Sequence, residues 1–125
     1  MSVLVGSSVW IAYFRDAGSG CDLDLLSDEN LVLVNDLILA ELLPPLHVRH
    51  QRKLIGLLKK IAQSPITIDW DDIVRLQIIC LRNDINRVGI PDLIIAQHAM
   101  QNGFELFSYD KHFTQLAGQV PLSLH

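Results

Sequence analysis

Residues 89–113 read GIPDLIIAQHAMQNGFELFSYDKHF and contain the pattern that decides the fold. Pro91 and Asp92 open a mostly apolar segment that stops at Asn102 and Gly103, as is typical of a helix that starts near a proline and ends before a glycine. Residues 104–107 predict a short strand, and Asp110 follows it. Ligands bind at the carboxyl edge of an open α/β sheet, so two carboxylates there could share a metal ion or a proton.

The same two acids have a purely structural interpretation. Asp92 suits the first turn of a helix, and Asp110 suits a turn. The pattern alone leaves both interpretations open.

Short apolar strands alternate with helices along the rest of the chain. Strands are predicted at residues 3–5, 31–34, 66–68 and 104–107, with a further edge strand at 120–124. The order predicts a single α/β domain over residues 1–125, with a mainly parallel sheet of four to five short strands covered by helices on both faces.

The predicted helices have recognisable ends. Ser7 or Ser8 is expected to cap a helix over residues 9–14, and a loop is expected at 16–20. Asn35 with Asp36 is expected to cap a helix over 37–43, which the prolines at 44 and 45 are expected to end. An amphipathic helix is predicted over 47–63.

A further helix is predicted from about residue 70 to residue 88. Its acids at 69, 71 and 72 are interpreted as caps rather than as a metal site. Its apolar residues at alternating steps of four and three predict a buried stripe: Val74, Ile78, Leu81, Ile85 and Val88.

Composition limits the classes of protein. The chain has 125 residues, half of them hydrophobic, so a folded core is expected. Two cysteines do not make a disulfide framework, and neither a signal peptide nor a membrane span is visible, so we expect a cytoplasmic protein.

The net charge of −4 argues weakly against nucleic-acid binding, but the charge is unevenly distributed. Residues 42–68 contain no acid and carry five basic side chains: Arg49, Arg52, Lys53, Lys59 and Lys60. This basic segment could bind a phosphate backbone or form a solvated helix face, and charge alone does not decide between the two. His47 and His50 belong to it and are given no metal role.

Three acids stand out by position: Glu41, Asp92 and Asp110. The sequence has no glycine-rich phosphate loop, no Cys/His zinc spacing and no nucleophile elbow. An all-oxygen site suits Mg²⁺ or Mn²⁺. Such an ion activates water and stabilises charge on a phosphoryl group, while nearby basic residues hold adjacent phosphates. The residues therefore predict metal-dependent phosphodiester cleavage.

Three stretches carry a resemblance to a known family: VLVGSSVWIAYFR at 3–15, ILAELL at 38–43 and the segment from residue 91 to 113. Together they resemble PIN-domain proteins, and among these the VapC-type toxins of type II toxin–antitoxin systems. The resemblance implies a three-layer α/β/α fold, Mg²⁺- or Mn²⁺-dependent endoribonuclease activity on RNA, a homodimer, and a small antitoxin that covers the site. By position, Glu41, Asp92 and Asp110 match the family's metal-binding and catalytic acids, and Ser8 matches a serine near the catalytic water.

Two positions depart from the family pattern, and the first matters more. Gly6 stands where the family has its first acidic ligand, and His112 replaces an acid often found two residues after the last aspartate. Gly6 fits a degenerate toxin, a change introduced for production, or a site rebuilt with another acid, for which Asp36 is the nearest candidate. The leading hypothesis is an endoribonuclease toxin weakened or inactivated by Gly6. The alternatives are a non-catalytic PIN scaffold that binds antitoxin or RNA, and a plain α/β domain whose acids only cap helices.

Overall fold

A four-stranded parallel sheet forms the middle of the molecule in the computed structural model, which describes residues 2–15 and 23–125. The strands are β1 (Val3–Val5), β2 (Val32–Val34), β3 (Ala62–Gln63) and β4 (Glu105–Phe107). Their order is β3-β2-β1-β4, and every neighbouring pair is parallel. The predicted loop at 16–20 lies outside the described residues. The predicted strand at 120–124 is reduced to one parallel bridge between Leu124 and Leu106.

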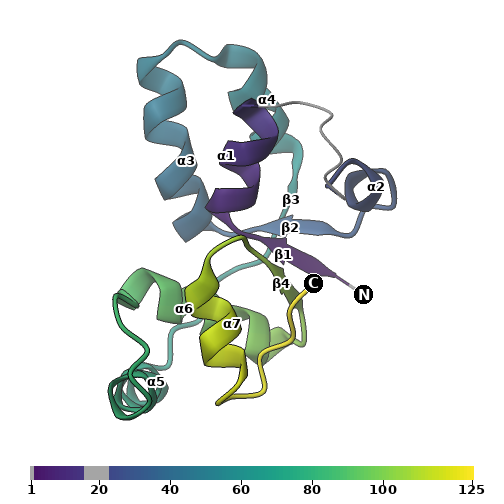
Figure 1. The fold of residues 1–125 in the computed structure, drawn as a ribbon. Coiled ribbons are helices and arrows are strands. Elements are labelled where there is room, and N and C mark those ends of the chain that lie inside the picture. Colours follow the sequence, from purple (N-terminus) through teal and green to yellow (C-terminus); the bar gives the residue numbers. More distant parts are fainter. Residues whose placement is uncertain (1, 16–22) are drawn as a thin grey trace.

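Helices cover both faces of the sheet, as predicted. They are α1 (Ser7–Arg15), α2 (Leu23–Asp28), α3 (Asp36–Val48), α4 (Arg52–Lys60), α5 (Trp70–Arg82), α6 (Ile90–Asn102) and α7 (Lys111–Ala117). Figure 1 shows α1, α3 and α4 on one side of the sheet and α5, α6 and α7 on the other. The three-layer α/β/α prediction is confirmed. None of the described helices is long and apolar enough to cross a membrane.

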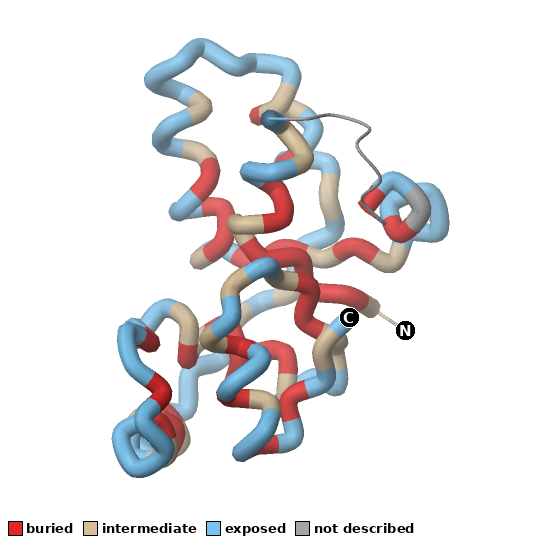
Figure 2. The backbone as a smooth tube through the Cα atoms, viewed as in Figure 1, coloured by how far each residue is buried: buried red, intermediate tan, exposed pale blue. Residues whose placement is uncertain are grey.

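The core lies where the strands meet the inner faces of the helices (Figure 2). All of β1 is buried, because a strand of a parallel sheet with helices on both faces is shielded on both sides. Trp10 of α1 is buried against this core, with Tyr13 and Phe14 packed beside it. The sheet and its helices therefore hold the loops at the carboxyl edge in fixed positions.

The prediction that Pro44 and Pro45 end a helix is wrong, because α3 continues through both to Val48. A proline inside a helix leaves the carbonyl four residues earlier without its amide partner. Here those carbonyls belong to Ala40 and Glu41, and all four residues are exposed. Water can therefore replace the missing hydrogen bonds.

The predicted helix over 47–63 is divided in two. His50 has a left-handed φ of 55°, which ends α3 and starts α4 in a new direction. The predicted strand at 66–68 is also wrong: β3 lies at residues 62 and 63, and the Ser64 amide donates to the Val34 carbonyl. The pairing with β2 therefore ends before residue 66, and Ile68 stays exposed despite its strand propensity.

Three of the five residues in the predicted stripe on α5 face away from the core. The helix ends at Arg82 rather than near Val88, so Ile85 and Val88 are buried beyond its end, and its own buried residues are Ile73, Leu76 and Cys80. The apolar residues on the outer face are 42–70% exposed: Val74 59%, Ile78 42%, Leu81 70% and, at the helix start, Trp70 59%. Both stripes have helical spacing, and only packing against α6 decides which is buried.

Two polar clusters join elements that are far apart in the sequence. The buried Asn35 caps α3 by accepting from the Ile38 amide at 2.8 Å, and its Nδ2 donates to His98 Nδ1 at 2.8 Å. His98 Nε2 lies 3.0 Å from Ser64 Oγ. Since the Asn35 oxygen is already occupied, its nitrogen faces His98, so His98 Nδ1 must be the unprotonated acceptor.

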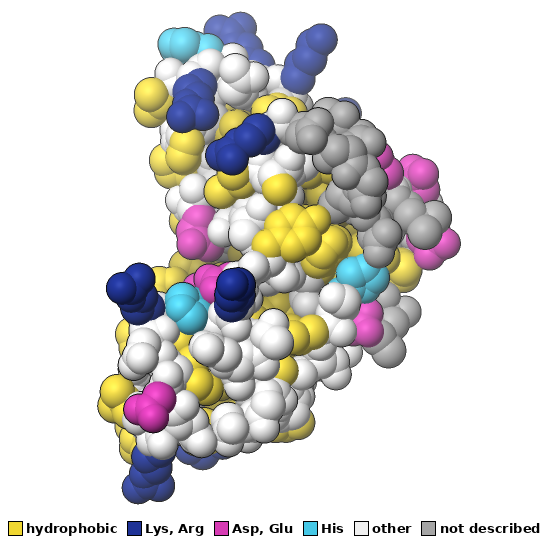
Figure 3. Space-filling view, viewed as in Figure 1, with side chains coloured by type: hydrophobic (Ala, Val, Ile, Leu, Met, Phe, Trp, Pro, Cys, Tyr) yellow, Lys and Arg dark blue, Asp and Glu magenta, His cyan; other side chains and the backbone are white. Residues whose placement is uncertain are grey.

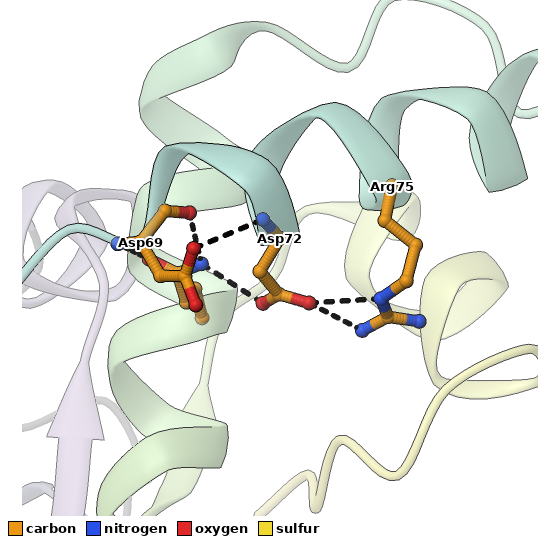
Figure 4. Close-up of polar contacts among 4 residues, drawn as sticks. Asp69, Asp72 and Arg75 are labelled. Atoms are coloured by element: carbon orange, nitrogen blue, oxygen red, sulfur yellow. Dashed lines mark hydrogen bonds and ion pairs between the residues drawn. The ribbon is translucent and has the colours of Figure 1, made fainter.

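The second cluster fixes α6 to the start of α5. The buried Gln97 accepts from the Asp69 amide at 3.1 Å and donates to the Asp69 carbonyl at 2.9 Å and to Asp72 Oδ2 at 2.8 Å. Asp72 also pairs with Arg75, and Asp69 caps α5 as predicted by accepting from the Asp72 amide (Figure 4). Burial favours a raised pKa for Asp72, but hydrogen bonds from Gln97 and Arg75 outweigh it and lower that pKa.

Candidate functional site

The structure brings the predicted site residues to one small pocket at the carboxyl edge of the sheet. Gly6 follows β1, Ser8 lies in the first turn of α1, Glu41 lies in α3, Asp92 lies in the first turn of α6, and Asp110 precedes α7. The pocket has a volume of about 40 Å³ and is lined by Gly6, Ser7, Ser8, Glu41, Asp92, Ile95, Ser108, Asp110 and Phe113. Segments that are far apart in sequence therefore converge at one place. Asp36 is exposed in the first turn of α3 and does not line this pocket.

Two of the acids, Asp92 and Asp110, lie close to His112, which the sequence pattern did not assign to the site. Asp92, Asp110 and His112 each offer one ligand atom, and these atoms lie within 4.8 Å of one another. His112 Nδ1 lies 2.9 Å from Asp110 Oδ1. Glu41 lines the same pocket but lies outside this closest group. The only sequence signal for His112 was its place two residues after Asp110, at the start of a helix.

Both aspartates also cap helices, so the structural interpretation is correct as far as it goes. Asp92 Oδ2 accepts from the Gly89 amide at 3.4 Å, and Asp110 Oδ1 accepts from the His112 amide at 2.9 Å. A carboxylate has about four lone-pair positions, so one capping bond leaves room for a cation. Capping and metal binding are compatible at these residues.

The pKa values of the acids show that they influence one another. Burial raises the pKa of Glu41, and the charge of Asp92 raises it further. Burial also raises the pKa of Asp92; the Gly89 amide lowers it, Asp110 raises it and His112 lowers it. Carboxylates that raise each other's pKa gain from a shared cation or proton.

Ser8 fixes the segment that carries Asp110. Its Oγ accepts from the Tyr109 amide at 3.0 Å and lies 3.2 Å from Ser108 Oγ, which in turn accepts from the Asp110 amide at 3.1 Å. The prediction that Ser7 or Ser8 caps α1 is wrong, because α1 already begins at Ser7. The Ser8 hydroxyl instead links the start of α1 to the loop after β4.

Gly6 leaves room for a side chain at the wall of the pocket. A Cβ at this position would lie 3.4 Å from the Phe107 carbonyl and 3.6 Å from Ser108 Cβ and Oγ, which are ordinary contacts. Its φ is not in the left-handed range, so the backbone does not require glycine. Neither space nor backbone conformation therefore excludes the acidic residue that the family resemblance leads us to expect at position 6.

A larger groove adjoins the small pocket. It has a volume of about 490 Å³ and is lined by residues of α1, α3, α4 and the turn before α4: Ile11, Phe14, Arg15, Glu41, Leu42, Pro45, Leu46, Arg49, Gln51 and Leu54. Glu41 lines both hollows. Figure 3 shows acidic side chains and a histidine left of centre between two Lys or Arg side chains, with more Lys and Arg along the upper edge.

A divalent cation fits the donor set of the small pocket. Its candidate ligands are the carboxylates of Asp92 and Asp110 and the Nδ1 atom of His112, with Glu41 nearby. His112 Nδ1 is buried and lacks a hydrogen-bond partner of acceptable geometry. A volume of about 40 Å³ exceeds the 10–15 Å³ that one water-sized sphere needs.

Comparison with known proteins identifies the same architecture. The family model described as PIN domain matches residues 3–119. No curated protein matches the chain by sequence.

Solved structures of toxin–antitoxin proteins share the fold. VapBC2 from Rickettsia felis, bound to a promoter DNA fragment, has a TM-score of 0.79 at 19% identity, covering 100% of this chain and 98% of that one. VapC20 of Mycobacterium tuberculosis, a sarcin-ricin loop cleaving toxin, has a TM-score of 0.65 at 20% identity, covering 98% and 99%. A toxin–antitoxin complex from Klebsiella pneumoniae gives 0.63 at 19% identity, covering 98% and 100%. At these identities the likeness concerns the fold.

Proposed function

This chain belongs to the PIN domain family, and from that premise we propose that it is a metal-dependent endoribonuclease of the toxin–antitoxin type. The observation that carries the proposal is the convergence of Asp92, Asp110 and His112 within 4.8 Å, beside Glu41, on this fold. The cofactor is Mg²⁺ or Mn²⁺, and the substrate is RNA.

The polar residues of the pocket have distinct parts in the proposed reaction. Asp92 and Asp110 would hold a divalent ion, which when bound would supply an activated water and stabilise charge on the phosphorus. Glu41, with its raised pKa, accepts a proton at the edge of the pocket. Ser8 and Ser108 keep Asp110 in place. Attack by water leaves a 5′-phosphate and a 3′-hydroxyl, without using the RNA 2′-hydroxyl.

Gly6 lowers the expected activity of the chain as written. It removes one carboxylate from a pocket that depends on accumulated negative charge, while leaving room for one. The second candidate function, a non-catalytic scaffold that binds antitoxin or RNA, rests on this single position.

The test is RNA cleavage in Mg²⁺ or Mn²⁺ by the chain as written, by Gly6→Asp, and by Gly6→Asp combined with Asp92→Asn. We expect little or no cleavage by the first, 5′-phosphate products from the second, and none from the third. The third variant controls for a contaminating nuclease. If Gly6→Asp folds but cleaves no RNA, the enzyme hypothesis is refuted and the non-catalytic scaffold that binds antitoxin or RNA is favoured.

The proposed antitoxin occupies the groove between α1 and α3. The groove is lined by apolar side chains, such as Phe14 and Leu46, and by the cations Arg15 and Arg49. This lining suits an apolar antitoxin segment that carries an acidic residue. Because Glu41 lines both hollows, a segment seated there would cover the small pocket. Binding of a cognate antitoxin should therefore weaken in Phe14→Asp and Arg49→Glu; unchanged affinity in both would rule out this groove.

The proposed homodimer uses the outer face of α5. Trp70, Val74, Ile78 and Leu81 lie within one narrow stripe and are exposed. Across a two-fold axis, two antiparallel copies would place Trp70 near Leu81, Val74 near Ile78, and Asp71 near Arg82 of the other copy. A face that matches itself in both shape and charge fits the isologous contact of a symmetric dimer.

A further inference from the structure

The small pocket differs from an all-oxygen site at two positions of this chain. Gly6 supplies no carboxylate, and His112 brings a nitrogen atom into the closest group. We propose that His112 Nδ1 is a direct metal ligand and that the pocket therefore binds a divalent first-row transition ion, such as Mn²⁺ or Zn²⁺, in preference to Mg²⁺. The inference rests on the metal site of the proposed function and assigns its selectivity to one residue.

The spacing of the donor atoms supports shared coordination. His112 Nδ1 lies 2.9 Å from Asp110 Oδ1, and all three candidate ligand atoms lie within 4.8 Å. With metal–ligand bonds of about 2.1 Å, neighbouring donors of an octahedral site lie about 3.0 Å apart and opposite donors about 4.2 Å apart. The 2.9 Å between His112 Nδ1 and Asp110 Oδ1 matches neighbouring donors, whereas the 4.8 Å limit for the whole group lies above the spacing of opposite donors, so side chains would have to close in slightly around an ion.

The environment of His112 supports the same assignment. Nδ1 is buried, and despite its short distance to Asp110 it makes no hydrogen bond of acceptable geometry. Asp110 Oδ1 already accepts from the His112 backbone amide at 2.9 Å. The ring nitrogen thus lies beside two carboxylates with its bonding capacity unused, as expected of a ligand atom.

The chemistry of the donors determines the selectivity. Mg²⁺ prefers oxygen ligands and binds carboxylates through their charge, so the loss of a carboxylate at position 6 reduces its affinity. Imidazole nitrogen suits transition ions such as Zn²⁺, and in the Irving–Williams order Mn²⁺ gains the least from it, so the preference for Zn²⁺ should be the stronger of the two. Both departures therefore shift the preference in the same direction.

A different role for His112 makes the opposite prediction. A protonated His112 would act as a resident cation that neutralises Asp92 and Asp110 and competes with the ion. Its removal would then strengthen the binding of every divalent ion, whereas removal of a ligand weakens the binding of transition ions.

The experiment measures binding of Mn²⁺, Zn²⁺ and Mg²⁺ by calorimetry to the full chain, without RNA, for the chain as written, His112→Gln, His112→Asp and His47→Gln. His47 is an exposed histidine of α3 and serves as the matched control. We expect His112→Gln to weaken Mn²⁺ and Zn²⁺ binding by at least about tenfold, since even groups that only orient a ligand contribute about 10- to 100-fold. Mg²⁺ should change less, and His112→Asp should move the preference toward Mg²⁺.

A second readout observes the ligand atom itself. In ¹H–¹⁵N spectra of the imidazole groups, Zn²⁺ should shift the His112 Nδ1 resonance and leave that of His47 unchanged. Unaltered or stronger transition-metal binding in His112→Gln, or no binding by the chain as written, overturns the inference. If His112 controls metal binding but Gly6→Asp cuts no RNA, the selectivity proposal is supported and the nuclease proposal is refuted. If Gly6→Asp cuts RNA but His112→Gln binds metal normally, the nuclease proposal is supported and the selectivity proposal is refuted.

Discussion

Replacing Asp92 by asparagine is expected to stabilise the metal-free protein at neutral pH. Asp92 is only partly exposed, and burial raises its pKa, with the Asp110 carboxylate adding to the effect. Asparagine keeps an oxygen that can accept the Gly89 amide hydrogen bond and removes the charge. The substitution thus separates the role of Asp92 as a cap from its cost as a crowded anion.

The magnitude follows from the distances in the pocket. Two like charges about 4–5 Å apart repel by about 1 kcal/mol in water and by about 3–4 kcal/mol at an effective dielectric constant near 20. The pocket is partly open to solvent and His112 offsets some of the repulsion, so we take the lower figure, about 1 kcal/mol. For a chain of this length, that corresponds to a rise in Tm of roughly 3–5 °C.

The sign depends on pH. The folded-state pKa of Asp92 is raised above its ordinary 3.8, so the charged carboxylate destabilises the folded state at neutral pH. This cost is relieved as the pH falls through the folded-state pKa toward 3.8, because the folded protein then binds the proton first. The advantage of Asp92→Asn should therefore shrink on acidification.

Thermal and urea unfolding in the presence of a chelator provide the assay. The matched control is Asp36→Asn, since Asp36 is an exposed acid in the first turn of α3 and its loss should be neutral or slightly destabilising. Added Mn²⁺ should reverse the order, because the unmodified pocket binds the ion more tightly. If Asp92→Asn loses as much stability in chelator as Asp36→Asn does, the carboxylates are not crowded and the reasoning fails.

Three further perturbations test other parts of the structure. Burial lowers the pKa of His98 below its ordinary 6.5, so its contribution to stability is complete above that pH and declines as the pH falls below it; Tm measured from about pH 8 to pH 5 should show a loss that His98→Gln reduces. Gln97→Leu should lower the free energy of unfolding by about 1–2 kcal/mol in urea, because it removes part-buried hydrogen bonds to the backbone of Asp69, whereas Gln101→Leu, at an exposed position of the same helix, should change it by less than about 0.5 kcal/mol. Leu81→Glu should convert the proposed dimer to a monomer in light scattering, and Leu57→Glu on α4 should not; a dimer that survives Leu81→Glu does not use the outer face of α5.

Local signals predicted the elements that position the site. Helix α6 starts beside Pro91 and ends at Gly103, whose φ of 67° suits glycine, and β1 and β4 are short apolar runs. In these segments the intrinsic preferences agree with the packing. The α/β class and the mainly parallel sheet could therefore be predicted from them, whereas the spatial order β3-β2-β1-β4 was not predicted.

The errors arose where tertiary contacts decide between equal local patterns. Helix α5 carries two apolar stripes, and periodicity does not tell that Leu76 is buried while Leu81 is 70% exposed. Pro44 would end a helix whose carbonyls were shielded, but here they face water. The part-buried hydrogen bonds of His98 and Gln97 join residues 34 and 28 positions apart, and no local sequence pattern predicts them.

At the site, too, local sequence signals predicted some residues and not others. Asp92 and Asp110 could be predicted because each stands at a helix start that faces the carboxyl edge of the sheet, and the structure gives both a capping bond. Those bonds hold the carboxylates close together whether or not a cation is present, so the helices provide the preorganisation that a metal site needs. His112 follows from the same geometry: as the second residue of α7, capped by Asp110, its ring lies within 2.9 Å of the carboxylate that starts the helix. A helix cap that positions both an acid and a nitrogen donor would allow this pocket to bind an ion without a carboxylate at position 6, and under our proposal that ion differs from the one that an all-oxygen site selects.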